Sequence, residues 1–139
     1  MSVEENKKAI YRAFEEVWNK GNYSIIPEVC SPDYVAHSGP QEIIGPDGFE
    51  QYVRNSRTTF PDLHYTVDEI IGEGDTLAIR LTMTGTFSGK MGDIEPTGNS
   101  VNYTFVLISR FVDGKCIESN VFGDSIVLYQ QMGVTLPMG

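Results

Sequence analysis

One acidic residue near the C-terminus has the setting that most favours chemistry. Asp124 is the only ionisable side chain in the otherwise mostly apolar run 121–128. A carboxylate removed from water favours its neutral form, so burial would raise the pKa of Asp124 toward the range useful for proton transfer near neutrality. This setting predicts a general acid or base. The structural alternative is that Asp124 caps a helix over 125–132, because aspartate is a preferred N-cap residue.

Two polar residues could assist such an acid. His37 ends a predicted strand, and its side chain can donate, accept or shuttle a proton near neutral pH; the alternative is a structural histidine held by hydrogen bonds. Asn120 precedes Asp124 by four positions. If the last strand continues to Asp124, then Asn120, Phe122 and Asp124 share one face, because side chains alternate with a period of two. Asn120 could then donate its amide hydrogen to Asp124 or to a substrate oxygen, or it could face water near the strand end.

Large aromatic side chains are the candidates for the wall of a pocket, and each of them is also an ordinary candidate for the core. Phe87 has the same parity as the apolar positions of its strand, so we expect it to line the cavity, whereas Arg80 has the opposite parity and should lie on the outer face. We expect His64 at the surface. The predicted substrate-binding residues are Trp18, Tyr34, Phe49, Phe60, Phe87, Tyr103, Phe105, Asn120 and Phe122, with Tyr52 as a further aromatic candidate.

Several other chemistries lack a motif in this chain. The sequence has no G-x-S-x-G nucleophile elbow, and its glycines do not follow the phosphate-loop or dinucleotide patterns. No CxxC motif or Cys/His cluster is present, so we expect no zinc site. The two cysteines, Cys30 and Cys116, are far apart in apolar settings and are expected to be reduced and buried.

Composition narrows the class of partner. The 139 residues suit a single domain spanning 1–139, and 19 acidic against 10 basic residues give a formal net charge of −9. This balance argues against nucleic acid and against anionic lipid, and it favours a neutral or weakly polar small molecule. The N-terminus lacks the apolar core of a signal peptide, and no apolar stretch is long enough to span a membrane. We therefore expect a cytoplasmic protein without a membrane partner.

The elements that would position these residues follow from periodicity. Apolar residues at helical spacing predict a helix that starts after a capping box at Ser2 and Glu5 and ends at Gly21. A second helix is expected over 46–59 and a last one over 125–132. Strands are predicted over 33–38, from 63 to a turn at 72–75, over 77–87, over 101–112 and over 116–122, with loops at 39–45 and 88–100.

This order of elements predicts an α+β domain with helices packed on one face of a mostly antiparallel sheet. The strands from residue 63 onward carry apolar residues at alternate positions, which suits a strongly curved sheet wrapped on helices. Such a sheet encloses a cone with an apolar interior, a usual place for a ligand pocket.

The whole chain resembles the SnoaL-like polyketide cyclases of the nuclear transport factor 2-like superfamily. The resemblance is carried by an ordered set of short pieces that covers nearly the entire sequence. They are Val17-Trp18-Asn19-Lys20-Gly21-Asn22, Asp33-Tyr34-Val35-Ala36-His37, Phe60-Pro61-Asp62-Leu63, Gly72 to Arg80, Thr84 to Gly89, Pro96-Thr97-Gly98, Asp113-Gly114-Lys115, Glu118, Asp124 and Gln131-Met132-Gly133.

The resemblance implies a cone-shaped α+β barrel, usually a homodimer or higher homo-oligomer, that needs no metal or cofactor. In these cyclases an aspartate at the position of Asp124 acts as the acid/base of an intramolecular aldol ring closure, and a histidine recurs at the position of His37. The family often has tryptophan where this chain has Asn120, and histidine where it has Phe87. Both departures fall where cavity side chains are expected, and they argue for a changed substrate or a changed reaction. Isomerisation, dehydration, epoxide opening and ligand binding without catalysis are alternatives on the same cone.

Overall fold

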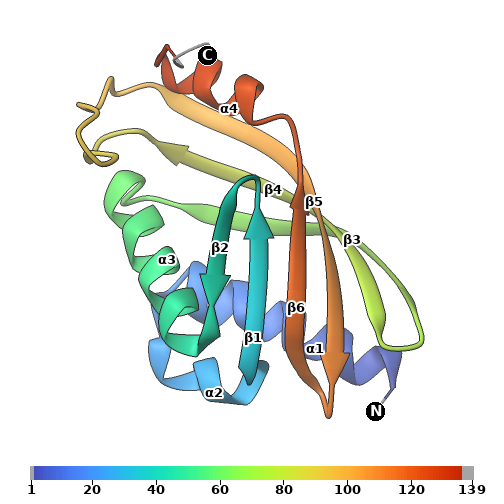
Figure 1. Cartoon of the computed structure of the whole chain (residues 1–139). Helices are drawn as coiled ribbons and strands as arrows, with labels where there is room; N and C mark the ends of the chain where they lie inside the picture. The colour runs from blue at the N-terminus through green and yellow to red at the C-terminus, as the bar shows by residue number, and fades with distance from the viewer. Residues whose placement is uncertain (1, 136–139) are drawn as a thin grey trace.

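The computed structural model describes residues 2–135, which form helices at both ends of the chain and a sheet between them. Figure 1 shows α1 crossing behind the strands, α3 beside the β1–β2 hairpin and α4 at the opposite end of the sheet from the N-terminus. The helices are α1 (Val3–Arg12), the π-helix η1 (Ala13–Trp18), the short 3₁₀ helix η2 (Tyr23–Ile25), α2 (Ile26–Val29), α3 (Gly45–Thr59) and α4 (Ser125–Met132). No helix within 2–135 is long and apolar enough to cross a membrane.

Six strands form one curved, open sheet in the order β2-β1-β6-β5-β4-β3. All neighbours are antiparallel except β1 and β6, which run parallel. The strands are β1 (Cys30–Ser38), β2 (Gln41–Ile44), β3 (His64–Glu73), β4 (Thr76–Thr86), β5 (Ser100–Val112) and β6 (Lys115–Phe122). The predicted α+β class, with a strongly curved and mostly antiparallel sheet, is confirmed.

Two local predictions were wrong. The segment expected to be a loop over 39–45 contains β2, which pairs with β1 through a tight hairpin at Gly39, whose φ is +60°. Four residues are too few for a period-two pattern to be recognised. β1 begins at Cys30 rather than at residue 33, with a shift of register between Cys30 and Val35. The helical stretch made of α1 and η1 ends at Trp18, and Gly21, the expected end, follows the next turn with φ +71°.

The core lies between the inner face of the sheet and the N-terminal helices. Leu77, Ile79 and Leu81 alternate along β4 and are completely buried against the apolar face of α1 and η1. Arg80 faces the other side, half exposed, with its guanidinium 3.8 Å from the carboxylate of Asp68 and 4.0 Å from that of Glu69. The expectation that Arg80 lies on the outer face is confirmed.

The two cysteines lie side by side in this core. Cys30 on β1 is in register with Cys116 on β6, and both are buried and free. Burial raises the pKa of the Cys30 thiol to about 12 and also raises the pKa of Cys116. The expected reduced state is confirmed, and the thiolate that reacts with electrophiles is scarce in the folded chain.

This burial predicts slow thiol labelling. At pH 8 both cysteines should resist an aromatic disulfide reagent in the native protein and react fully once denaturant exposes them. The absorbance of the released thiolate, followed against denaturant concentration, measures the reaction. Rapid labelling of native protein would contradict the buried placement of these thiols.

Candidate functional site

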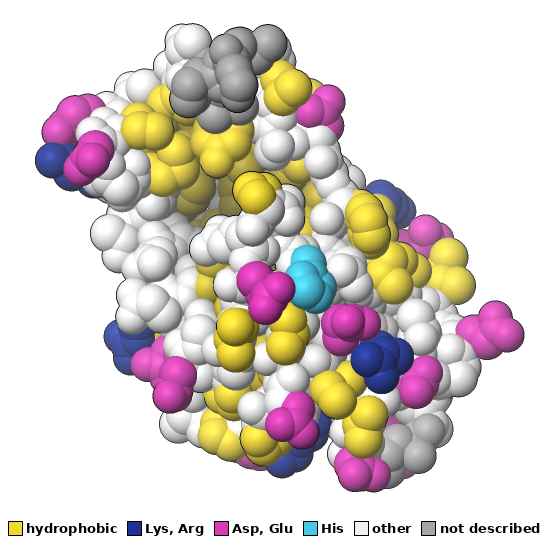
Figure 2. Space-filling model, viewed as in Figure 1, with side chains coloured by type: hydrophobic (Ala, Val, Ile, Leu, Met, Phe, Trp, Pro, Cys, Tyr) yellow, Lys and Arg dark blue, Asp and Glu magenta, His cyan; other side chains and the backbone are white. Residues whose placement is uncertain are grey.

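The surface is hollow at the end of the sheet next to α4, which we call its wide end. Figure 2 shows the surface hollowed between α4 and the tip of the β1–β2 hairpin, with apolar side chains lining the depression. On the inner face of the sheet, Tyr65 on β3 pairs with Met83 on β4, which pairs with Tyr103 on β5. The next inner position of β5, Phe105, is half-buried. Since the helices do not fill this end, the inner face of the sheet supplies the walls.

A continuous aromatic cluster runs from the core to the rim of this hollow. The ring of Tyr103 stacks on Phe105 with centroids 5.7 Å apart, and Phe105 meets Tyr65 at 5.9 Å. Tyr65 lies edge-on to Trp18 at 4.9 Å. Trp18, Tyr34, Phe49, Tyr103 and Phe105, all predicted to bind substrate, belong to this cluster.

Hydrogen bonds from Asn19 and Arg57 fix the backbone at Tyr65 and Trp18, two residues of this cluster. Asn19 accepts the backbone N–H of Tyr65 at Oδ1 (2.7 Å) and donates from Nδ2 to the Tyr65 carbonyl oxygen (2.9 Å). Arg57 donates from Nη1 to the carbonyl oxygens of Trp18 (2.7 Å) and Asn19 (3.1 Å). Trp18 ends the π-helix, so its carbonyl lacks the usual helical acceptor role and is available to Arg57.

A side-chain amide also attaches α4 to β5 beside the hollow. Gln131 accepts the N–H of Asn102 (2.8 Å) and donates to the Asn102 carbonyl oxygen (3.0 Å), one residue before Tyr103. Asn99 donates to the Gln131 carbonyl (3.2 Å), and the Thr97 hydroxyl donates to the carbonyl of Met132. The β4–β5 loop and α4 are therefore held as one wall.

Asp124 lies at the rim and caps α4. Its Oδ1 accepts the N–H of Ile126 at 3.1 Å, so the capping interpretation is confirmed. The residue is exposed, and the expected burial of its carboxylate is not found. The preceding Gly123 lies against Tyr103, since a Cβ placed on Gly123 would clash with the Tyr103 hydroxyl and lie 2.8 Å from Cβ of Phe105. Asp124 thus neighbours the hollow without being enclosed by it.

Burial makes several inner tyrosines weaker acids. Burial raises the pKa of Tyr34, Tyr52 and Tyr65, although hydrogen bonds to Ser119 and Ser38 offset the effect for Tyr34 and Tyr52. Burial, followed by the negative charge of Asp124, raises the pKa of Tyr103. These phenols remain neutral donors at physiological pH.

The structure turns three of the predicted site residues away from the hollow. On β6 the buried Ser119 is the inner position, so Asn120 and Phe122 lie on the outer face. Phe122 is 57% exposed. His37 is in register with Asn120 on that outer face, and its Nδ1 lies 3.7 Å from the Glu42 carboxylate across the hairpin. Asn120 and Phe122 do share a strand face, as expected, but it is the solvent face.

Two further predicted residues belong to the core. Phe87 is completely buried and Phe60 is 6% exposed, and their rings meet each other 6.1 Å apart. Phe87 has the inward parity that we expected, but no surface through which a ligand could reach it. His64 on β3 is exposed, as predicted.

Sequence reasoning missed Tyr65 and Tyr129 as residues of this region. Tyr65 has inward parity between Leu63 and Val67, and this parity was the available signal. Tyr129 packs on the core from α4. Only the tertiary fold brings α4 to the core, so no local signal marked Tyr129.

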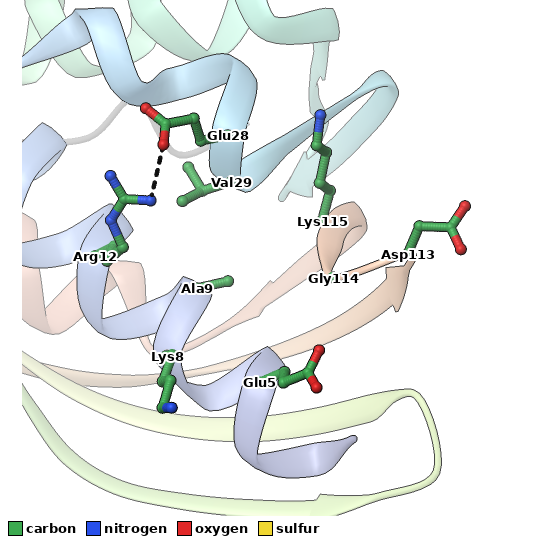
Figure 3. Close-up of a pocket in the computed structure, with 9 residues that line it drawn as sticks. All are labelled: Glu5, Lys8, Ala9, Arg12, Glu28, Val29, Asp113, Gly114 and Lys115. Atoms are coloured by element: carbon green, nitrogen blue, oxygen red, sulfur yellow. Dashed lines mark hydrogen bonds and ion pairs between the residues drawn. The ribbon is translucent and has the colours of Figure 1, made fainter. Parts of the chain in front are cut away.

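A second depression lies far from these residues. Figure 3 shows a pocket of about 230 Å³ between α1, α2 and the β5–β6 turn, with charged side chains of both signs at its rim. Arg12 and Glu28 neutralise each other across it at 3.2 Å. None of the predicted site residues lines it. Within 2–135, no three His, Cys, Asp or Glu side chains converge as a metal site.

Comparison with known protein families shows which family this chain belongs to. The model of the SnoaL-like polyketide cyclases matches residues 8–132. The chain belongs to the SnoaL-like polyketide cyclase family. No curated protein matches this SnoaL-like chain.

Solved structures agree with the fold of this SnoaL-like chain. AclR, a proposed hydroxylase from Streptomyces galilaeus, is 30% identical with a TM-score of 0.82, over 99% of this chain and 87% of AclR. IdmH, a proposed polyketide cyclase from Streptomyces antibioticus, is 27% identical with a TM-score of 0.77, over 93% and 99% of the two chains. A proposed SnoaL-like polyketide cyclase from Jannaschia sp. CCS1 is 22% identical with a TM-score of 0.86, over 98% of each chain.

The contact between Gly123 and Tyr103 predicts a position-specific cost in this SnoaL-like chain. Gly123→Ala should lower the free energy of unfolding by about 1–3 kcal/mol, because the added methyl group overlaps two packed side chains. Gly48→Ala, inside α3, is the matched control: its new Cβ would lie 3.5 Å from Ile43, so stability should hold or rise. Urea unfolding measures both, and equal effects would contradict the packing at Gly123.

Proposed function

We propose that this chain is a cofactor-free enzyme that performs polyketide-cyclase-like proton transfer on a small apolar carbonyl compound. The observation that carries the proposal is the position of Asp124 at the rim of an aromatic hollow, one residue from the contact between Gly123 and Tyr103. Membership of the cyclase family supports it. The hollow suits an apolar ring or chain, and the phenol hydroxyls suit its carbonyl oxygens.

The proposed step uses Asp124 as a base and then as an acid. Its carboxylate removes a proton from a carbon next to a carbonyl, leaving an enolate. The enolate carbon attacks a second carbonyl of the same molecule, forming the carbon–carbon bond of a new ring. The resulting alkoxide takes back the proton from Asp124, so the product is an isomer of the substrate. No oxidant or reductant is consumed.

A binding module without catalysis is the second candidate. Asp124 is exposed, and His37 points to the outer face, so neither is held in a closed site in the single chain. These two observations favour a protein that holds a small molecule in the aromatic hollow without reacting it. Isomerisation or dehydration would use the same proton-transfer groups, whereas an epoxide-opening set that includes Arg80 is disfavoured by its outward position.

We further propose that the protein works as a homodimer or higher homo-oligomer in the cytoplasm. Large apolar side chains are exposed at Ile44 (65%), Phe122 (57%) and Ile126 (54%), and a second copy would remove them from water. The net charge of −9 suits neither nucleic acid nor an anionic membrane as partner.

Hydrogen–deuterium exchange tests the base directly without knowledge of the natural substrate. In D₂O the protein should accelerate loss of the α-proton signal of 2-tetralone, a small aromatic ketone, as followed by proton NMR. Asp124→Asn should reduce the accelerated rate by roughly 10²–10⁴, the usual contribution of a positioned general base.

The asparagine variant separates the two roles of Asp124. Asparagine caps helices about as well as aspartate, so Asp124→Asn should keep the stability of α4, whereas Asp124→Ala should lose about 1 kcal/mol as well as the exchange activity. Full exchange activity in the asparagine variant would overturn the proposed base. Tight binding of ketones without any exchange by the wild-type protein would establish the binding module instead.

A further inference from the structure

The Tyr103 hydroxyl occupies a distinct place among the phenols of the hollow. It lies against Gly123, the residue before the proposed base, so closely that a methyl group on Gly123 would overlap it. Burial, followed by the negative charge of Asp124, raises the pKa of this phenol. Tyr103 is 9% exposed as a whole residue, and its ring stacks on Phe105. The packed ring therefore holds the hydroxyl in place beside Gly123.

The other buried phenols are already engaged or lie deeper. The hydroxyls of Tyr34 and Tyr52 interact with Ser119 and Ser38, respectively. Tyr65 is enclosed between Trp18 and Phe105. Among residues 2–135, no hydrogen bond engages the Tyr103 hydroxyl, and its oxygen is not one of the polar atoms buried without a partner, so its donor can serve a ligand.

We propose that Tyr103 donates its hydroxyl hydrogen to the carbonyl oxygen of the compound whose neighbouring carbon Asp124 deprotonates. This inference rests on the proposed function and adds a residue to it. When the C–H bond breaks, its electron pair enters the new carbon–carbon double bond and the charge develops on the carbonyl oxygen. A phenol at that oxygen stabilises the enolate, while the proton itself stays on Asp124 until ring closure.

The surroundings of Tyr103 suit this role. A donor that is fixed before the reaction needs no reorganisation when the charge appears, and the loss of one such donor typically costs 10²–10³ in rate. Aromatic neighbours lower the local polarity, which strengthens a hydrogen bond to a developing anion. A phenol that stays neutral at physiological pH can donate throughout the reaction.

A naphthol probe tests the hydrogen bond. 2-Naphthol resembles an enol in shape, its ionised form carries the negative oxygen of an enolate, and its fluorescence distinguishes the two forms. Asp124→Asn imitates the base after it has gained the proton, so this variant should bind the naphtholate ion and lower the apparent pKa of the bound naphthol. Adding Tyr103→Phe, which keeps the stacked ring, should weaken naphtholate binding at least tenfold.

The matched control is Tyr11→Phe in the same Asp124→Asn background, since Tyr11 is 44% exposed on α1 and away from the hollow. Naphtholate affinity should be unchanged in this control. Equal affinity in the Tyr103 and Tyr11 variants, or no naphtholate binding by Asp124→Asn itself, would overturn the proposal. Urea unfolding of each variant confirms that the fold is retained.

Exchange kinetics separate this inference from the proposed function. Tyr103→Phe should lower kcat for 2-tetralone exchange by 10²–10³ with little change in KM, because the bond strengthens as the charge develops. If exchange depends on Asp124 but not on Tyr103, the result supports the proposed function and contradicts the proposed role of Tyr103. If naphtholate binding depends on Tyr103 while exchange ignores Asp124, Tyr103 binds the ligand oxygen and the proposed base is wrong.

Discussion

The six-stranded sheet must bury one apolar face, and the helices cover only part of it. At the narrow end, α1 and η1 seal the inner positions of β4, where Leu77, Ile79 and Leu81 have no exposed surface. At the wide end the same alternation of side chains continues, but no helix fills the space. Aromatic rings, which offer large apolar surface together with a polar edge, take over there. The hollow is thus the part of the inner face that no helix covers. Its polarity depends on which inner residues carry hydroxyl groups.

Holding such a hollow open requires walls that do not collapse inward. Two side-chain amides serve this purpose by engaging both backbone groups of a single residue: Asn19 fastens β3 at Tyr65, and Gln131 fastens β5 at Asn102. Each adds two hydrogen bonds of the kind that a neighbouring strand would supply. Asp124 adds the third fixed point, since it starts α4 by capping it. A residue used to anchor an element is also positioned for chemistry, so the structural and functional interpretations of Asp124 are compatible.

The outer face has a different character. His37, Asn120 and Glu42 line up across β1, β6 and β2, where the cyclase resemblance had suggested pocket residues. Their place follows from the parity of β6: Ser119 is buried inside the cone, where its hydroxyl shares a hydrogen bond with that of Ser109, and Asn120 must then face outward. The polar groups on the inner face are consequently the tyrosine and serine hydroxyls rather than His37 and Asn120. This arrangement explains how the chain keeps the fold of the cyclases while differing from them at the positions of Asn120 and Phe87.

The sequence alone predicted the α+β class, the ends of most helices and strands, the reduced cysteines and the capping role of Asp124, because caps, glycine turns and side-chain periodicity are local effects. It also named five aromatic residues of the cluster from their aromatic type. Tertiary structure decided the rest. Whether an inward side chain such as Phe87 lines a cavity or fills the core depends on the helix opposite it, and which face of β6 is inner depends on its pairing with β1 and β5. The meeting of Tyr103 with Gly123 depends on the bend between β6 and α4, which no local pattern encodes.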